Sequence, residues 1–171
     1  MEKEVYLAAD RAMRRRTEAA GIERFPKRKG ELAELAFTFK AASLGLAVCK
    51  PYGDSLPFDF IVQRGRRSLR VQVKSTFRSI RAGHEVGMHG PDKRPYTAEE
   101  VDFIAAYIVP HDAWYIIPIE AIGGRKTIRL YPKGSSRAGA GRFEEFFEAW
   151  HLLSGIPEET VEPEEALVGA E

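Results

Sequence analysis

Apolar and polar positions alternate at helical spacing near the start of the chain. Over residues 4–20 small and aliphatic side chains alternate with arginines, and Gly21 ends the pattern. The spacing predicts a first helix, followed by a basic linker that reaches residue 29.

A second helical pattern is predicted to follow Gly30 and to end at Gly45. Phe37 and Leu44 are apolar on its other sides, so we expect a helix covered on more than one flank, as when a helix packs on a sheet. Its main apolar face is expected to consist of Leu32, Leu35, Ala36, Phe39 and Ser43.

Short β-prone runs bounded by turn residues follow this helix. Strands are predicted at residues 47–50, 58–63 and 68–77, with a turn around Gly65 between the last two. Three adjacent strands after one helix indicate an α/β domain with a central sheet.

The second half of the chain is predicted to hold three more strands and a helix. Residues 78–97 show little periodicity and are expected to form a long loop. Strands follow at 103–109, 114–118 and 127–131. A helix over 142–153 carries an aromatic face that is expected in the core, made of Phe143, Phe146, Phe147 and Trp150.

Charge is uneven along the chain, although the net charge is only +1. Residues 11–29 are strongly basic and the residues after Pro157 are rich in glutamate. Without its acidic C-terminal residues the chain is basic, which is typical of a protein with a phosphate-binding surface. The single cysteine, Cys49, excludes an intramolecular disulfide and a cysteine metal cluster. With no apolar leader or membrane span in the sequence, a cytoplasmic protein is expected.

Polar residues alternate with apolar residues in the strand predicted at 68–77. Gln72 and Lys74 share one side of it, and the valines at 71 and 73 share the other. In the preceding strand Asp59 lies between two phenylalanines. If the two strands form a hairpin around Gly65, then Asp59, Gln72 and Lys74 converge at one edge of the sheet, where a glutamate of the preceding helix could join them.

Such a cluster suits Mg²⁺, which takes oxygen ligands and is often held by one or two carboxylates together with substrate phosphate. Asp59 would supply the charge, and the side-chain carbonyl of Gln72 and the backbone carbonyl of Val73 would supply neutral oxygens. Lys74 would position the attacking water and offset charge that develops on the phosphate.

These residues resemble the PD-(D/E)XK nucleases in their Gln-x-Lys variant, and most closely the bacterial branch related to group I intron homing endonucleases. The resemblance rests on the segments GDSLPFDFIV, VQVKS, VDFIAAY and WYIIPI, and it spans residues 29–132. It implies a restriction-endonuclease-like fold with a mixed central sheet flanked by helices. It also implies an active-site set of Glu34, Asp59, Gln72 and Lys74.

Two departures from the family pattern bear on the metal. Pro57 lies two residues before Asp59 rather than next to it, and Gln72 cannot ionise, so the site holds less negative charge. The helix acid is also open between Glu34, which the family spacing favours, and Glu31.

The resulting hypothesis is an endonuclease that cuts double-stranded DNA with Mg²⁺, for which Mn²⁺ is expected to substitute. Its domain is expected over residues 30–156, after a basic helix and linker at 1–29 and before an acidic, disordered tail at 157–171. Because two strands must be cut, a homodimer or higher oligomer is expected, joined through the aromatic C-terminal helix or the first helix. The expected phosphate contacts are Arg15, Arg16, Lys27, Arg28, Lys29, Arg66, Arg67, Arg78 and Arg81.

Two other functions fit the same sequence: a catalytically silent nucleic-acid-binding or assembly module, and a junction-resolving nuclease. His84, His89 and His111 lack the spacing of a zinc site, and the first two are expected in a loop near DNA. Tyr96 and Asp102 match family positions without an assigned role, although Asp102 could pair with an arginine.

Overall fold

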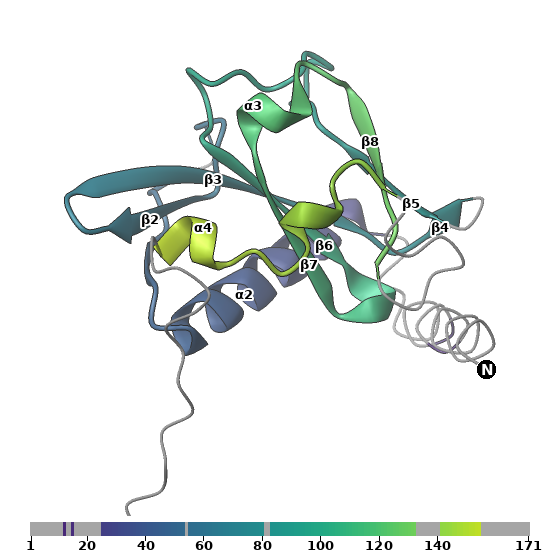
Figure 1. Ribbon diagram of the computed structural model, residues 1–171, viewed down its shortest axis with the longest axis horizontal. Helices are drawn as coiled ribbons and strands as arrows, with labels where there is room; N and C mark the ends of the chain where they lie inside the picture. The colour runs from purple at the N-terminus through teal and green to yellow at the C-terminus, as the bar shows by residue number, and fades with distance from the viewer. Residues whose placement is uncertain are drawn as a thin grey trace, which may run out of the picture.

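A five-stranded mixed sheet forms the centre of the protein in the computed structural model, which describes residues 12, 15, 25–53, 55–80, 83–132 and 141–154. The strand order is β1-β2-β3-β6-β7, and only β3 and β6 run parallel (Figure 1). The strands are β1 (Ala47–Cys49), β2 (Phe60–Arg64), β3 (Arg67–Thr76), β6 (Phe103–Ile108) and β7 (Ala113–Pro118). The predicted α/β fold with a mixed central sheet is confirmed.

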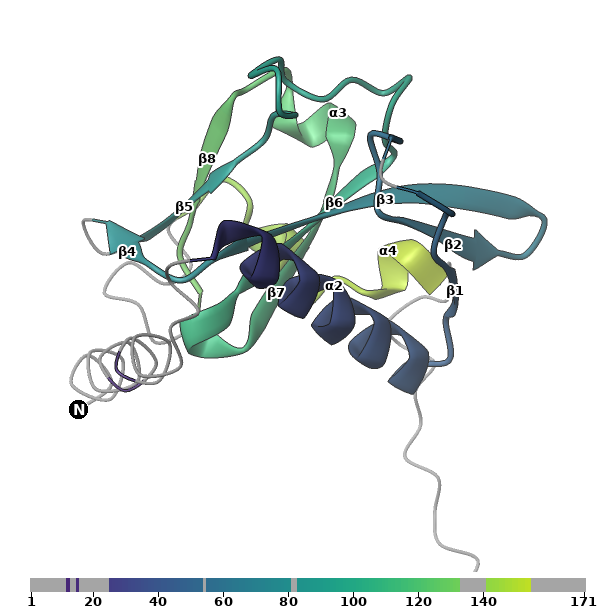
Figure 2. The ribbon, with the colours of Figure 1, turned by 180° about the vertical axis from the view of Figure 1, so that it is seen from behind.

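Each face of this sheet is covered by a different layer. On one face lie the helices α2 (Pro26–Ser43) and α4 (His151–Ser154). Phe37 of α2 and Trp150, the residue before α4, pack with Trp114 of β7 at centroid distances of 5.5 to 5.8 Å. Figure 2 shows α2 crossing the sheet obliquely. The other face packs against a second sheet and the short helix α3 (Ile119–Ile122).

The second sheet corrects the prediction of a long loop over 78–97. It consists of β4 (Ser79–Ile80), β5 (Gly83–Gly87) and β8 (Thr127–Leu130), all antiparallel. Besides its neighbour β4, β5 pairs with β8, which is more than 40 residues away, with Glu85 opposite Arg129. Pairing over that separation leaves no hairpin signal in the local sequence. Val86 and Met88 from this region are buried in the core.

The buried face of α2 differs from the predicted one. Ala33, Phe37 and Ala41 face the sheet, whereas Leu35 is 67% exposed and Phe39 is 78% exposed. Two of the three buried positions are alanines, whereas large apolar side chains lie on the outer face. The prediction took the face with more large apolar side chains as the buried one and was therefore wrong. Of the large side chains of α2, Phe37 is the one that packs on the sheet, between the two alanines. The helix also begins at Pro26, four residues before Gly30, with proline favoured at a first turn.

The C-terminal segment is not the continuous helix predicted over 142–153. A 3₁₀ turn, η3 (Glu144–Phe146), is followed by Phe147, which forms a β-bridge with Tyr115, and then by α4. Glu148, at φ 49°, accepts a hydrogen bond from the Trp114 N–H at 2.7 Å. Pairing with β7 therefore replaces the helix. The prediction that its aromatic residues belong to the core is confirmed, since Phe143 and Trp150 are buried.

Two predicted elements, the helix at 4–20 and the tail at 157–171, lie outside the described residues apart from positions 12 and 15. Another 3₁₀ turn, η2 (Val109–His111), links β6 to β7. Among the helices in the described part of the chain, none has the length and apolar character needed to cross a bilayer.

Candidate active site

The β2–β3 hairpin brings Asp59 and Gln72 together as predicted. Arg64 pairs with Arg67, so the turn holds Gly65 and Arg66, and Gly65 adopts a φ of 58° that glycine tolerates best. Pairing continues past the start of β2, because the Asp59 N–H donates to the Val71 carbonyl at 3.0 Å. The Asp59 side chain is thereby held against the middle of β3.

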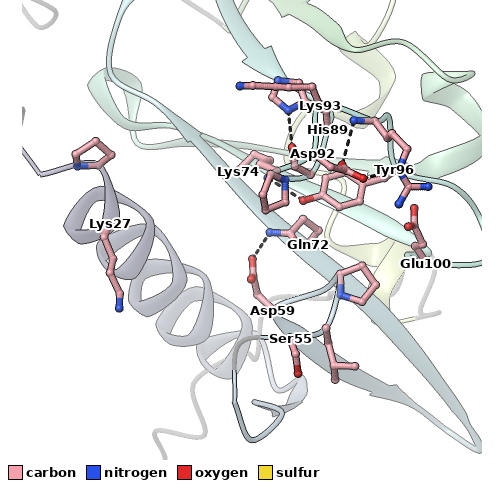
Figure 3. Close-up of a pocket in the computed structure, with 16 residues that line it drawn as sticks. Lys27, Ser55, Asp59, Gln72, Lys74, His89, Asp92, Lys93, Tyr96 and Glu100 are labelled. Carbon is pink, nitrogen blue, oxygen red and sulfur yellow. Dashed lines mark hydrogen bonds and ion pairs between the residues drawn. The ribbon is translucent and has the colours of Figure 1, made fainter.

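Two oxygen atoms converge on the side-chain amide of Gln72. Its Nε2 donates to Asp59 Oδ2 at 2.5 Å and to the Val73 backbone carbonyl at 3.1 Å (Figure 3). Asp59 Oδ2 also accepts the Val73 N–H at 2.8 Å. Gln72 is buried, although the alternating pattern of β3 places it on the polar side of the strand.

Lys74 lies one pleat further along the same side of β3. Its Nζ donates to the Tyr96 hydroxyl at 3.0 Å and lies 4.9 Å from the centre of the Tyr96 ring. Burial lowers the pKa of Lys74 below its ordinary 10.5, and the Asp59 carboxylate opposes that change. Asp59, Gln72 and Lys74 all line two neighbouring hollows in the surface, a smaller one and a larger one.

Glu34 approaches these residues from α2. It borders a hollow of about 390 Å³ that Asp59, Gln72, Val73 and Lys74 also line. Glu31 borders neither this hollow nor the larger one beside it. The geometry therefore favours Glu34 over Glu31 as the helix acid, although its role stays a prediction.

Lys50, which the sequence reasoning missed, lies beside the carboxylates. Its Nζ forms a 2.6 Å ion pair with Glu34 Oε2, and this contact raises the pKa of Lys50. Its positive charge also acts on Asp59. Lys50 directly follows β1, so only the pairing of β1 with β2 brings it to the site, and no local motif indicates it.

Asp59 is held in an environment that disfavours its charge. Burial raises the pKa of Asp59 to about 6, and repulsion from Glu34 adds to the rise. The Val73 N–H, Lys74 and Lys50 act in the opposite direction and only partly offset it. Two carboxylates that repel each other in a partly buried hollow create a position where a cation would be stabilised.

The oxygen donors fit a divalent metal ion such as Mg²⁺. Asp59 Oδ2 and the Val73 carbonyl already point at one position, now taken by the Gln72 amide nitrogen. A cation bound between these two oxygens would displace the nitrogen, and rotation of the Gln72 amide would direct its oxygen toward the ion. Within the described residues no group of three or more His, Cys, Asp and Glu side chains could hold a metal. A site here would therefore combine Asp59, with or without Glu34, with neutral oxygens.

The larger hollow, of about 1020 Å³, opens on the other side of these residues. Its walls are the start of α2, the segment before β2, and the loop between β5 and β6. Lys27 lines it from α2, and Lys93 and Arg94 line it from the loop; Figure 3 labels the two lysines. The loop cations were not among the predicted phosphate contacts, because nothing in their local sequence shows that the loop folds toward the site.

The structure places the predicted phosphate contacts in different regions. Lys27 and Lys29 line the two hollows. Arg66 and Arg67 lie at the hairpin turn, seven residues from Lys74 along β3, or roughly 20 Å. Three more are exposed and line neither hollow: Arg15, Arg28 and Arg78. Arg16 and Arg81 lie outside the described residues.

Of the two histidines predicted in a loop near DNA, His89 lies in the loop between β5 and β6 and His84 does not. His84 is fully buried in β5, where its ring lies edge-on to His111 at 5.1 Å, so it is not exposed to DNA. His89 does line the larger hollow, and its Nδ1 lies 2.9 Å from the Gly90 carbonyl.

Asp102 has a structural pairing that the sequence left open. Its two oxygens contact Arg70 Nε and Nη2 at 3.0 and 2.9 Å, and Oδ2 also accepts the Arg70 N–H at 2.7 Å. The Arg70 side chain holds the pKa of Asp102 below its ordinary value. Asp102 thus ties β3 to the start of β6.

A mixed sheet whose middle strand carries Gln72 and Lys74 beside Asp59, with the Glu34 helix packed on it, has the architecture of a restriction-endonuclease-like fold. Residues 25–153 match the PD-(D/E)XK endonuclease family, which is most of the chain, and the protein belongs to that family. The resemblance stated from the sequence is confirmed.

A solved structure described as that of a bacterial homing endonuclease, I-Ssp6803I, is similar to this chain. The two share 29% sequence identity and a TM-score of 0.65, and the match covers 75% of this chain and 92% of the other. No curated protein matches the chain.

Proposed function

We propose that the protein is a Mg²⁺-dependent endonuclease that hydrolyses phosphodiester bonds in double-stranded DNA. The observation that carries this proposal is the convergence of Asp59 Oδ2 and the Val73 carbonyl on the Gln72 amide, beside the half-buried Lys74. The bacterial homing endonuclease that the chain resembles supports the choice of DNA.

Each residue has a chemical task in this proposal. Asp59, Gln72 and Val73, with Glu34 opposite, would hold the metal, which when bound supplies Lewis-acid stabilisation at the phosphate. The Lys74 ammonium, which faces the same hollow, orients the attacking water and offsets the negative charge that grows in the transition state. Burial of Asp59 and Lys74 strengthens these electrostatic effects, because the local dielectric is lower than in water.

The cations around the hollows would hold the DNA backbone on either side of the scissile bond. Lys27 and Lys29 of α2 lie on one side, and Lys93 and Arg94 of the loop lie on the other. Contacts of this kind position the duplex and confer little sequence selectivity.

We also propose a homodimer, because each chain carries one site and two strands must be cut. Phe143 and Trp150 at the C-terminal end are buried in the core and offer little surface for its interface. The outer face of α2, defined by Leu32, Leu35 and Phe39, is exposed, and apolar surfaces of this kind mark interaction sites. A second copy packed on it through a two-fold axis would cover the same face on both chains.

The direct test is incubation of the protein with supercoiled and four-way-junction DNA in Mg²⁺, Mn²⁺ or EDTA. Metal-dependent cutting of the supercoiled duplex supports the proposal. Cutting of the junction alone indicates a structure-selective nuclease instead. DNA binding without any cutting identifies a silent binding module.

A further inference from the structure

Tyr96 contacts Lys74 through two parts of its side chain. The hydroxyl oxygen accepts a hydrogen bond from Lys74 Nζ at 3.0 Å, and the ring centre lies 4.9 Å from the same nitrogen. Within the described part of the chain, Tyr96 is the one hydrogen-bond partner of this ammonium group, because Asp59 acts on Lys74 through charge alone.

Tyr96 is itself held firmly. Its side chain is 8% exposed and packs in the core between the two sheets, and its N–H donates to the Met88 carbonyl at 3.3 Å. The residue before it, Pro95, forms a β-bridge with His89, and the Gly90 N–H donates to the Arg94 carbonyl within the same loop. The phenol is therefore a fixed acceptor.

Lys74 needs such an acceptor. A lysine side chain has four rotatable carbon–carbon bonds, and its ammonium group is free to point in many directions unless a partner fixes it. The strand fixes only the backbone of Lys74. Lys74 and Tyr96 both line the larger hollow. The contact with Tyr96 must therefore fix where Nζ lies relative to Asp59 and to this hollow.

We propose that Tyr96 is a positioning residue. Its hydroxyl holds the Lys74 ammonium where it can orient the water that attacks the phosphate. This inference rests on the proposed nuclease function of the same site. It gives the loop between β5 and β6 a part in catalysis: a segment that brings Lys93 and Arg94 to the DNA also sets the geometry of Lys74.

The test compares Tyr96→Phe with Tyr107→Phe. Tyr96→Phe keeps the buried ring over Lys74 and removes only the hydroxyl. Tyr107→Phe also removes one hydroxyl, which donates to Asp112 at 2.7 Å away from both hollows. Three quantities are measured: the single-turnover cleavage rate with saturating enzyme, DNA affinity in Ca²⁺, and the NMR signals of the two Lys74 Hε protons in the metal-free protein.

Tyr96→Phe is expected to lower the cleavage rate about tenfold, the effect of losing one hydrogen bond to a charged group, while DNA affinity stays within about twofold. The two Hε signals, separate when the side chain is fixed, are expected to merge. Tyr107→Phe leaves all three quantities at the native values.

A cleavage rate for Tyr96→Phe within twofold of the native rate, with the Hε signals still separate, would overturn the assignment. If the native protein cuts no DNA, the nuclease proposal fails. The NMR comparison still decides whether Tyr96 holds Lys74, because it needs neither metal nor substrate.

Discussion

Asp59 is the residue on which the electrostatics of the site depend. It is half-buried, lies near Glu34, and is kept in place by the Val73 N–H and the Gln72 amide. An ionised carboxylate there is unfavourable without a cation. Ionised Asp59 therefore lowers the stability of the metal-free protein, and a bound metal ion would offset this loss.

This leads to a pH-dependent prediction for metal-free protein. The pKa of Asp59 is about 6 in the folded state and has an ordinary value of 3.8. The folded state binds the proton more tightly, so the ionised group destabilises the fold above pH 6, and acidification through pH 6 relieves that effect. In EDTA at pH 8, Asp59→Asn is expected to raise the free energy of unfolding by on the order of 2 kcal/mol.

Urea unfolding at pH 8 and pH 5 checks this prediction. The advantage of Asp59→Asn is expected to shrink at the lower pH, and Glu99→Gln, a change at an exposed side chain, is expected to show none. An Asn variant that is less stable than the native protein at pH 8 would contradict the assignment of a strained carboxylate.

At the scale of elements, β3 is the strand that organises the site. It pairs with β2 on one side to hold Asp59 and with β6 on the other in the one parallel pair of the central sheet. Alternation along β3 and the glycine turn before it were readable from the sequence, and so was the convergence of Asp59, Gln72 and Lys74.

Elements that depend on distant partners could not be predicted in the same way. β5 forms because it pairs with β8. Phe147 is not helical, although its sequence pattern predicts a helix, because it forms a β-bridge with Tyr115. The sequence also could not show that Lys50 meets Glu34, since strand pairing creates that contact. In α2, the exposed Leu35 and Phe39 masked the alanine face that packs on the sheet.

The parallel pairing of β3 and β6 is expected to depend on Asp102. Its carboxylate binds the backbone and side chain of Arg70, and its own N–H donates to the Arg70 carbonyl. Asp102→Asn is expected to lower the free energy of unfolding at pH 7 by about 1 to 2 kcal/mol, through loss of a charge-assisted pair that is partly screened by solvent.

The pH dependence of this effect has the opposite sign to that of Asp59. Arg70 lowers the pKa of Asp102, so its stabilisation is present above the ordinary carboxyl pKa and is lost as pH falls through the lowered value. Thermal unfolding at pH 7 and pH 3 measures it. Asp92→Asn, which breaks an exposed pair with Arg94, is the control; equal effects of the two substitutions would argue against a special role for Asp102.

At the scale of the whole molecule, the charged and apolar surfaces bear on how DNA lies on the protein and how copies associate. Basic side chains of α2 line the hollows on one side, and basic side chains of the loop between β5 and β6 line them on the other. The hairpin turn with Arg66 lies at the far end of β3. The outer face of α2 is apolar and carries no part of either hollow. DNA and a second copy therefore have separate surfaces available.

If DNA lies across the larger hollow, Lys93 contacts a phosphate and Arg66 does not. Lys93→Gln is expected to weaken DNA binding in Ca²⁺ and to reduce the slope of log affinity against log salt by about 1. Arg66→Gln also removes one positive charge and is the control; it is expected to leave this slope unchanged. A larger loss for Arg66→Gln would place the duplex along the hairpin instead.

The proposed dimer is tested by light scattering at several protein concentrations. Phe39→Lys places a charge on the outer face of α2 and is expected to give a monomer, since an unpaired charge would be buried between the copies. Ile80→Lys changes an exposed apolar residue on β4 and is expected to keep the native mass. A native protein that is monomeric throughout would refute the dimer.

The central claim is that Asp59 and Lys74 form the active site of a metal-dependent endonuclease. It is tested most directly by supercoiled-DNA cleavage in Mg²⁺ and Mn²⁺ with native protein, Asp59→Ala, Lys74→Ala and the exposed control Lys126→Ala at equal concentration. We expect cutting by the native protein and Lys126→Ala, none by the other two, and DNA binding by all four in Ca²⁺. Undiminished cutting by Asp59→Ala or Lys74→Ala would contradict the account.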